Sequence, residues 1–306
     1  MGHLVIALFG PTASGKTAVA EALAERIRAE LISADSMQVY RGLPILTNQP
    51  SKPTRLVAIW PLHKEASVGE YQRLAHAAID HALAQRRTPI VVGGTGLYLR
   101  AALAELQVPP APSPEARARW ERLYDRLGPE RAHCLLAGRD PQAASRVHPR
   151  DRRRVVRALE LAEMGYSLRP RNDRLWSAEA RHPTLLVGLD VPREELERRI
   201  RARTEAMLAA GAAEEARRAL QGRLSTTARQ AIGLLELARL PAREAAEAIV
   251  LRTRQYASYQ RKWMRRLPGL ATVDGTRPPH EIADEILDLA RRRQRLPAHR
   301  GARAGA

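Results

Sequence analysis

The sequence predicts an α/β fold: a parallel sheet flanked by helices and interrupted by a helical insertion. Two observations support this class. Short apolar runs alternate with helical patterns, which is typical of parallel strands that are buried on both faces. A polar, Arg-rich stretch then follows the tract PPAPSP and contains no clear strand. The strands are expected at 4–9, 30–35, 56–60, 89–93 and 184–189.

Helical patterns fill the segments between these runs. They extend to about Arg28 after the first run and cover 68–86, 193–208 and 242–266. The domains expected from this pattern are a core of residues 1–108 and 183–290, a mobile helical insertion at 109–182, and a disordered basic tail at 291–306.

Composition indicates a polyanionic partner. The 306 residues include 51 Lys and Arg against 33 Asp and Glu, a formal net charge of +18. Such a surplus favours phosphate contacts with a nucleic acid. An anionic membrane surface is the weaker alternative, because no short terminal amphipathic segment concentrates the charge.

Several classes of protein are excluded or disfavoured. No apolar run of about 18 residues is present to span a membrane. The first residues lack the basic start of a signal peptide. The single cysteine, Cys134, excludes an intramolecular disulfide and a multi-cysteine zinc site. We therefore expect a cytoplasmic protein without membrane contact.

The strongest local motif is GPTASGKT, which matches the P-loop pattern GxxxxGK[ST] between a strand and a helix. It makes the predicted fold P-loop NTPase-like. Backbone N–H groups of such a loop converge on an anion, the Lys adds positive charge, and the Thr hydroxyl suits Mg²⁺. A simple turn would not require Lys-Thr at its end. Whether the phosphate belongs to a nucleoside triphosphate or another diphosphate stays open. The phosphate-binding residues are Gly10, Pro11, Thr12, Ala13, Ser14, Gly15, Lys16 and Thr17.

Two further strand ends are expected at the rim that contains the P-loop, because ligands of open α/β sheets bind beyond the carboxyl ends of the strands. Asp35 ends the second strand and could accept a proton from a nucleophile; it could equally cap a helix. Thr95 brings a hydroxyl to this rim from the Gly-rich segment 93–98, which alone is an ordinary turn. Three ends that converge favour a binding site.

Two basic segments suit a nucleic acid. The run 150–157 places four Arg at helical spacing, and 252–266 mixes Arg and Lys with Tyr256, Tyr259 and Trp263. Arg and aromatic side chains together suit phosphates and unpaired bases. The alternative is a solvated helix face whose aromatic residues turn into the core, and for 252–266 we expect part of each.

In this order, the motifs resemble those of the tRNA dimethylallyltransferases (tRNA isopentenyltransferases) in their bacterial form, over nearly the whole chain. The most specific parts are DSMQVYRG joined to GGTGLY; PSPEARAR, HPRDRRRVVRALE, RRIRARTEAMLAAG, ARQAIG and TRQYASYQRKWMRR match as well. The resemblance implies transfer of a dimethylallyl group from dimethylallyl diphosphate to the exocyclic amine of an adenine. That adenine is adjacent to the anticodon on its 3′ side, in tRNAs that read codons starting with U.

The resemblance also implies roles for single residues. The P-loop would bind diphosphate and Mg²⁺, with Thr17 on the metal. Lys16 and Arg203 would stabilise the leaving diphosphate, Asp35 would be the general base, and Thr95 would contact the reacting centre. The partner would be the anticodon stem-loop of tRNA; independently of the resemblance, the simplest expectation is a monomer that binds one tRNA. The tRNA-binding residues would be Asp35, Ser36, Met37, Gln38, Thr95, Arg117, Arg153, Arg154, Val155, Val156 and Arg157.

Two segments depart from the family pattern. After Gly42 the family commonly has DIGTAKP, whereas this chain has PILTNQP at 44–50, without the Lys. After Gly233 it usually has Tyr and a basic residue, whereas Leu234 and Leu235 stand here. We expect these differences to affect tRNA contacts and to leave the catalytic set unchanged.

Two other functions fit part of the sequence. A P-loop kinase of a small molecule or of a polynucleotide end would use Asp35 on an acceptor hydroxyl and the Arg residues of the insertion as a lid. That hypothesis explains the basic second half of the chain less easily. A non-catalytic RNA-binding protein with a relic P-loop would not need Asp35 at all.

Overall fold

The computed structural model describes residues 4–110, 113–168 and 174–295. They form two compact units, one within residues 1–104 and 178–306 and the other at 105–177, where the sequence predicted an insertion at 109–182. Two residues of the Pro-rich tract, Ala111 and Pro112, lie outside the described residues, and so does 296–306.

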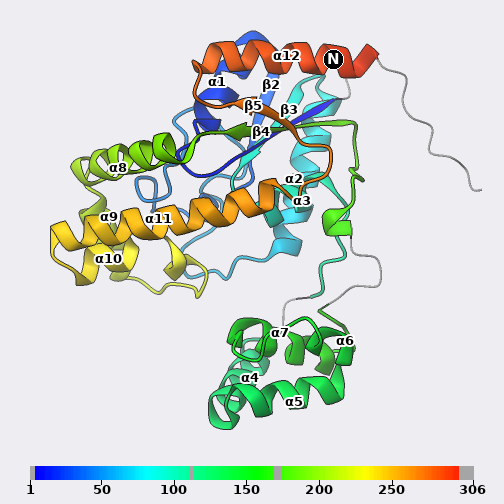
Figure 1. Ribbon diagram of the computed structural model, residues 1–306, viewed down its shortest axis with the longest axis vertical. Coiled ribbons are helices and arrows are strands. Elements are labelled where there is room, and N and C mark those ends of the chain that lie inside the picture. The colour runs from blue at the N-terminus through cyan, green and yellow to red at the C-terminus, as the bar shows by residue number, and fades with distance from the viewer. Residues whose placement is uncertain (1–3, 111–112, 169–173, 296–306) are drawn as a thin grey trace, which may run out of the picture. The chain divides into compact units, whose positions relative to one another are not determined.

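A five-stranded parallel sheet forms the centre of the larger unit (Figure 1), and the predicted fold class is confirmed. The strand order is β2-β3-β1-β4-β5, so β1 lies in the middle, between β3 and β4. The strands are β1 (Val5–Phe9), β2 (Ala29–Ser33), β3 (Thr88–Gly93), β4 (Thr184–Asp190) and β5 (Ala271–Asp274). Four of them were predicted. β5 was not, because it has only four residues and buries only Val273.

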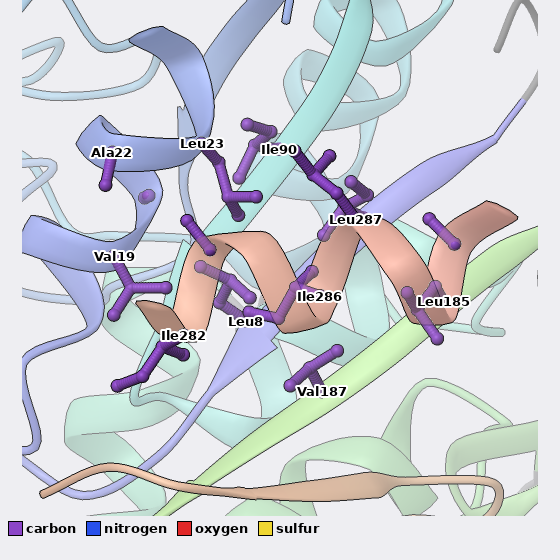
Figure 2. Packing of buried hydrophobic residues seen from close by; sticks show 14 of the residues in the cluster. Leu8, Val19, Ala22, Leu23, Ile90, Leu185, Val187, Ile282, Ile286 and Leu287 are labelled. Carbon is purple, nitrogen blue, oxygen red and sulfur yellow. The ribbon is translucent and has the colours of Figure 1, made fainter. Parts of the chain in front are cut away.

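Helices α1 (Lys16–Arg26) and α12 (Pro279–Arg295) cover one face of the sheet. Figure 2 shows their apolar side chains packed on alternate residues of the strands, such as Leu8 and Val187. Alternation arises because successive strand residues point to opposite faces. α12 continues to Arg295, past residue 291, where the sequence predicted the start of a disordered tail.

Helices α2 (Val68–Ala84) and α3 (Gly96–Leu103) contact β3 from the other side of the sheet. α2 begins where the Ser67 side chain accepts a hydrogen bond from the Glu70 N–H, a standard N-cap. The Tyr71 hydroxyl of α2 donates to the Ser33 carbonyl at the end of β2, 2.9 Å away. This contact fixes the chain just before Asp35.

The remaining helices of the larger unit follow β4. α8 (Arg193–Ala209) and α11 (Ala242–Met264), green and orange in Figure 1, pack on each other. Both reach the P-loop, through hydrogen bonds to Thr12. α9 (Ala212–Leu220) and α10 (Leu234–Arg239) contribute to a second apolar cluster, which also contains Leu43, Leu46 and Ile249. The 3₁₀ turn η2 (Ala228–Gln230) precedes α10.

The strand predicted at 56–60 is wrong. Only isolated bridges form there, between Ile32 and Arg55 and between Tyr40 and Trp60. Leu56 and Ala58 have φ angles of 65° and 53°, which no strand accommodates. The apolar run is nevertheless buried at Leu56 and Trp60, so burial without regular structure produced the strand-like pattern.

The smaller unit is helical, as predicted, and no strand occurs among its described residues. Its elements are α4 (Pro114–Leu127), α5 (Pro129–Arg139), α6 (Pro141–Ala144), α7 (Arg152–Glu163) and the 3₁₀ turn η1 (Arg174–Trp176). Trp120, Leu136 and Leu159 lie in its apolar core. Over the described part of the chain, no helix has the length and apolar content needed to cross a membrane.

Candidate active site

The predicted P-loop joins β1 to α1 at the middle of the sheet. Gly15 caps α1 with a φ of 89°, a left-handed conformation that glycine adopts without steric cost. No side chain caps this end of α1, and its first turn contains no carboxylate. The first N–H groups of the helix therefore suit an anion.

A cavity of about 360 Å³ lies beside this loop. Its walls come from the P-loop, the segment after β2, the end of β3, and helices α8 and α11. Its charged lining residues are Lys16, Asp35, Arg199 and Arg203. The volume suits a small organic diphosphate. Three cationic side chains thus share one cavity with one carboxylate.

The surroundings of Lys16 in the cavity lower its pKa. Its Nζ donates to the Pro11 carbonyl at 2.6 Å. Burial lowers the pKa of Lys16 to about 7; the negative charge of Asp35 opposes this shift and the positive charge of Arg203 adds to it. Asp35 and Arg203 therefore lie close enough to Lys16 for their charges to shift its pKa. The sequence predicted that Lys16 and Asp35 face one cavity, and the structure places them there.

Arg203 reaches the P-loop from α8. Its Nη1 donates to the Thr12 hydroxyl at 2.9 Å, and burial lowers the pKa of its guanidinium while Asp35 raises it. One turn earlier, Arg199 lines the same cavity and donates to Glu195 and to the Gly275 carbonyl. Arg199 was not predicted as a site residue. Its position four residues before Arg203 on a helix was the available signal.

Asp35 does not cap a helix, because no helix lies between β2 and α2 in the described chain, so the capping alternative is wrong. Its Oδ1 accepts hydrogen bonds from the N–H groups of Met37 at 2.8 Å and Gln38 at 3.4 Å, within the turn that follows β2. The same side chain lines the cavity. The local hydrogen bonds fix the orientation of a carboxylate that also faces the P-loop.

Thr95 lies next to the Asp35 segment. Its Oγ1 accepts from the Ser36 N–H at 3.2 Å and lies 3.3 Å from the Ser36 hydroxyl. It also lies 3.2 Å from the hydroxyl of Tyr256, which lines the cavity from α11. Burial raises the pKa of Tyr256, and the charge of Asp35 raises it further, so this hydroxyl stays protonated.

The family models decide which family these features belong to. A model described as IPP transferase matches residues 38–267, and one described as isopentenyl transferase matches residues 3–55. The chain belongs to the IPP transferase family. The family predicted from the motifs is thereby confirmed.

Curated relatives and solved structures agree with this assignment. A tRNA dimethylallyltransferase of Anaeromyxobacter dehalogenans is 42% identical over 295 residues, 91% of this chain and 94% of the relative. One of Acidothermus cellulolyticus is 39% identical over 301 residues, 94% and 91% of the two chains. The crystal structure of a full-length tRNA isopentenylpyrophosphate transferase from Bacillus halodurans has a TM-score of 0.68 at 29% identity, covering 96% of this chain and 98% of that one.

The first segment that departs from the family pattern, residues 44–50, forms part of the cavity wall. Thr47, Asn48 and Pro50 line the cavity. Just before them, the N–H groups of Ile45 and Leu46 donate to the buried carboxylate of Glu215, at 2.9 and 2.8 Å. Glu215, on α9, therefore sets the course of this segment. It was not predicted, because its partners are about 170 residues away in the sequence.

Gln38, which was predicted to contact tRNA, forms hydrogen bonds within the protein. Its Oε1 accepts from the Ser33 hydroxyl at 2.8 Å, and its Nε2 donates to the carbonyls of Asn48 at 2.9 Å and Thr47 at 3.3 Å. It also lines the cavity. Gln38 thus joins the end of β2 to the divergent segment 44–50. Met37, next to it, is half-buried against the apolar cluster of α9 and α10.

At the second departure from the family pattern, Leu234 lies in a hydrophobic cluster. Leu234 is fully buried with Leu43, Leu46 and Ile249 in the cluster around α9 and α10. A Tyr hydroxyl at that position would need a polar partner in this cluster. Leu235, beside it, is partly exposed.

The predicted tRNA-binding residues of the smaller unit fall into three groups. Arg153 and Arg154 are exposed at the start of α7. Arg117 and Arg157 donate to the buried carboxylate of Glu160, at 3.1 and 3.2 Å, so part of their charge is neutralised inside the unit. The third group consists of two core residues, Val155 and Val156. The structure does not support a tRNA contact by the side chains of the third group.

Proposed function

We propose that this chain transfers a dimethylallyl group from dimethylallyl diphosphate to the exocyclic amine of the adenine 3′-adjacent to the anticodon. The tRNAs concerned read codons starting with U, and diphosphate is released. The observation that supports this best is the single cavity that contains Lys16, Arg203 and Asp35. The tRNA dimethylallyltransferases to which the chain is similar extend the argument to the substrates.

The cationic side of the cavity suits the leaving group. The bond between the allylic carbon and the diphosphate oxygen breaks, and negative charge grows on the diphosphate. Lys16, Arg203 and the first N–H groups of α1 are donors that face this charge. A bound diphosphate raises the pKa of Lys16 and keeps its ammonium form, because a nearby anion favours the charged state.

The anionic side of the cavity suits the nucleophile. The exocyclic nitrogen forms a bond to the allylic carbon and becomes acidic as it does so. Asp35 accepts the released proton, so a neutral secondary amine remains. The N–H groups of Met37 and Gln38 hold the carboxylate in place for this step.

The donor set also fits Mg²⁺. Mg²⁺ prefers oxygen ligands and is commonly held by one or two protein groups together with substrate phosphates and water. The Thr17 hydroxyl lines the cavity next to Lys16 and would hold the ion. No group of three or more His, Cys, Asp or Glu that could form a complete protein cage occurs among the described residues. The ion would neutralise diphosphate charge.

The tRNA explains the basic composition. The target adenine leaves its stack to enter a closed cavity, as base-modifying enzymes require. We infer that Arg153 and Arg154, exposed on the smaller unit, contact phosphates of the anticodon stem-loop. We propose a cytoplasmic monomer that binds one tRNA.

Mass spectrometry of tRNA nucleosides tests the proposal. After incubation of the chain with tRNA, dimethylallyl diphosphate and Mg²⁺, we expect the modified adenosine to have gained one dimethylallyl group in place of a hydrogen. Radiolabelled ATP tests the kinase alternative in parallel, and we expect no phosphate transfer. Unmodified tRNA together with labelled phosphate on an acceptor would overturn the proposal.

A further inference from the structure

Gln260 of α11 joins two neighbouring loops of the cavity wall, which follow the adjacent strands β1 and β3. It is almost fully buried, and it lines the cavity. Its Oε1 accepts from the N–H of Thr12 in the P-loop at 2.7 Å, and its Nε2 donates to the carbonyl of Gly94 at 2.9 Å. A backbone N–H only donates and a carbonyl only accepts, so these two partners fix the orientation of the amide.

The shape of the second loop matches this side chain. A Cβ on Gly94 would lie 2.2 Å from Nε2 of Gln260, and a Cβ on Gly96 would lie 2.2 Å from the Trp263 ring. Gln260 and Trp263 are three residues apart on α11, so they lie on one face of that helix. The Gly-rich segment therefore packs directly against α11 at Gly94 and at Gly96, and Thr95 lies between these two contacts.

The two loops that Gln260 joins serve different substrates in the proposed reaction: one contributes to the diphosphate site and the other lies next to Asp35. Thr12 belongs to the P-loop and also accepts from Arg203. Gly94 precedes Thr95, whose hydroxyl contacts the Ser36 backbone next to Asp35. One amide thus connects the diphosphate side of the cavity to the proton-accepting side. The separation of the two sides matters, because a misplacement of about 1 Å costs on the order of 100-fold in rate.

We infer that Gln260 is a positioning residue that sets the separation between the diphosphate site and the acceptor adenine. The inference rests on the proposed function. Gln260 need not contact either substrate. Its hydrogen bonds to Thr12 and Gly94 hold the two loops at the spacing in which the allylic carbon lies between the leaving diphosphate and the attacking amine.

Two substitutions test the inference by single-turnover transfer at saturating dimethylallyl diphosphate and tRNA. Gln260→Met keeps the length of the side chain and removes both hydrogen bonds, and we expect the transfer rate to fall about 10- to 100-fold. The dissociation constant for tRNA should stay within about twofold, because no tRNA contact is removed. Gln85→Met, at an exposed position after α2, is the matched control and should transfer at the wild-type rate.

The pH profile of Gln260→Glu separates positioning from general stability. A protonated carboxyl can accept from Thr12 and donate to Gly94, as the amide does, whereas an ionised one cannot donate. Burial raises the pKa of a carboxyl, so we expect the ratio of variant to wild-type rate to rise as pH falls. This readout also applies if Gln260→Met folds poorly.

The outcomes are distinct from those for the function itself. An inactive wild-type chain would refute the proposed function whatever the variants do. An active wild type, with Gln260→Met within about twofold of it or with a Gln260→Glu ratio that does not change with pH, would overturn the positioning role.

Discussion

The rate of dimethylallyl transfer should decrease above neutral pH because Lys16 loses its proton. The structure lowers the pKa of this side chain to about 7, chiefly through burial. Only the ammonium form stabilises an incoming diphosphate, so kcat/KM for dimethylallyl diphosphate follows the protonated fraction of Lys16 in the free enzyme. That fraction is nearly complete below about pH 6, is about one half at pH 7 and is lost as pH rises further.

The size of the effect follows from the shift. With a pKa of about 7, about one tenth of Lys16 is protonated at pH 8 and about one hundredth at pH 9. We therefore expect kcat/KM to fall about fivefold between pH 7 and pH 8 and about tenfold between pH 8 and pH 9. An unperturbed lysine, with its ordinary pKa of 10.5, would produce no decrease in this range.

Initial rates with radiolabelled dimethylallyl diphosphate and saturating tRNA, between pH 6 and about pH 9, measure this dependence. Lys16→Arg is the informative variant, because a guanidinium stays charged throughout the range. Its kcat/KM should be lower at neutral pH but should not decrease at alkaline pH. A flat wild-type profile above pH 7, or a decrease that persists in Lys16→Arg, would refute the reasoning.

Three further predictions concern the cavity and the insertion. Arg203→Met removes a cation that lines the cavity and donates to Thr12, and initial rates should show kcat/KM lower by about 100- to 1000-fold. Gly96→Ala forces a Cβ against the Trp263 ring, and thermal unfolding should show a loss of about 1–3 kcal/mol in stability. Replacing both Arg153 and Arg154 by Ala should reduce the slope of log affinity for tRNA against log salt concentration by about one unit or more.

Matched controls exist for the charge changes. Arg198→Met removes a guanidinium from the exposed face of α8, where it pairs with Glu195, and should leave kcat/KM unchanged. Replacing both Arg291 and Arg292 by Ala on α12 removes two exposed charges, as in the test variant, and the salt slope should stay at the wild-type value. Control variants that behave like the test variants would show that the effects arise from net charge alone.

The parts of the fold that carry a local sequence pattern were predictable from the sequence. β1, β2, β3 and β4 are short apolar runs, and the P-loop between β1 and α1 has fixed spacing, so both could be located without coordinates. β5 is too short and too exposed to show a pattern. The segment 56–60 shows the converse case: it is partly buried, and its apolar residues suggested a strand that positive φ angles prevent.

The candidate site was predictable where residues follow a motif. Lys16, Asp35 and Arg203 were named from motifs, and the structure brings them to one cavity. Gln260 and Glu215 were missed because each acts through hydrogen bonds to backbone about 170 to 250 residues away, and such pairs leave no local pattern in one sequence.

The valine pair of α7 illustrates another limit. Arg153 to Arg157 form one continuous run in the sequence, and all of them were assigned to tRNA binding. A helix turns about 100° per residue, so a run of five cannot face one partner. The structure turns Val155 and Val156 into the core and leaves Arg153 and Arg154 exposed.

The transfer rate of Asp35→Asn tests the central claim most directly. Asn has the same shape and keeps an oxygen that can accept from the Met37 N–H, so the local backbone is preserved while the proton acceptor is lost. In a single turnover with saturating tRNA and dimethylallyl diphosphate, we expect the rate to fall by about 100-fold or more, with tRNA affinity unchanged. A variant that transfers the dimethylallyl group within about fivefold of the wild-type rate would contradict the account.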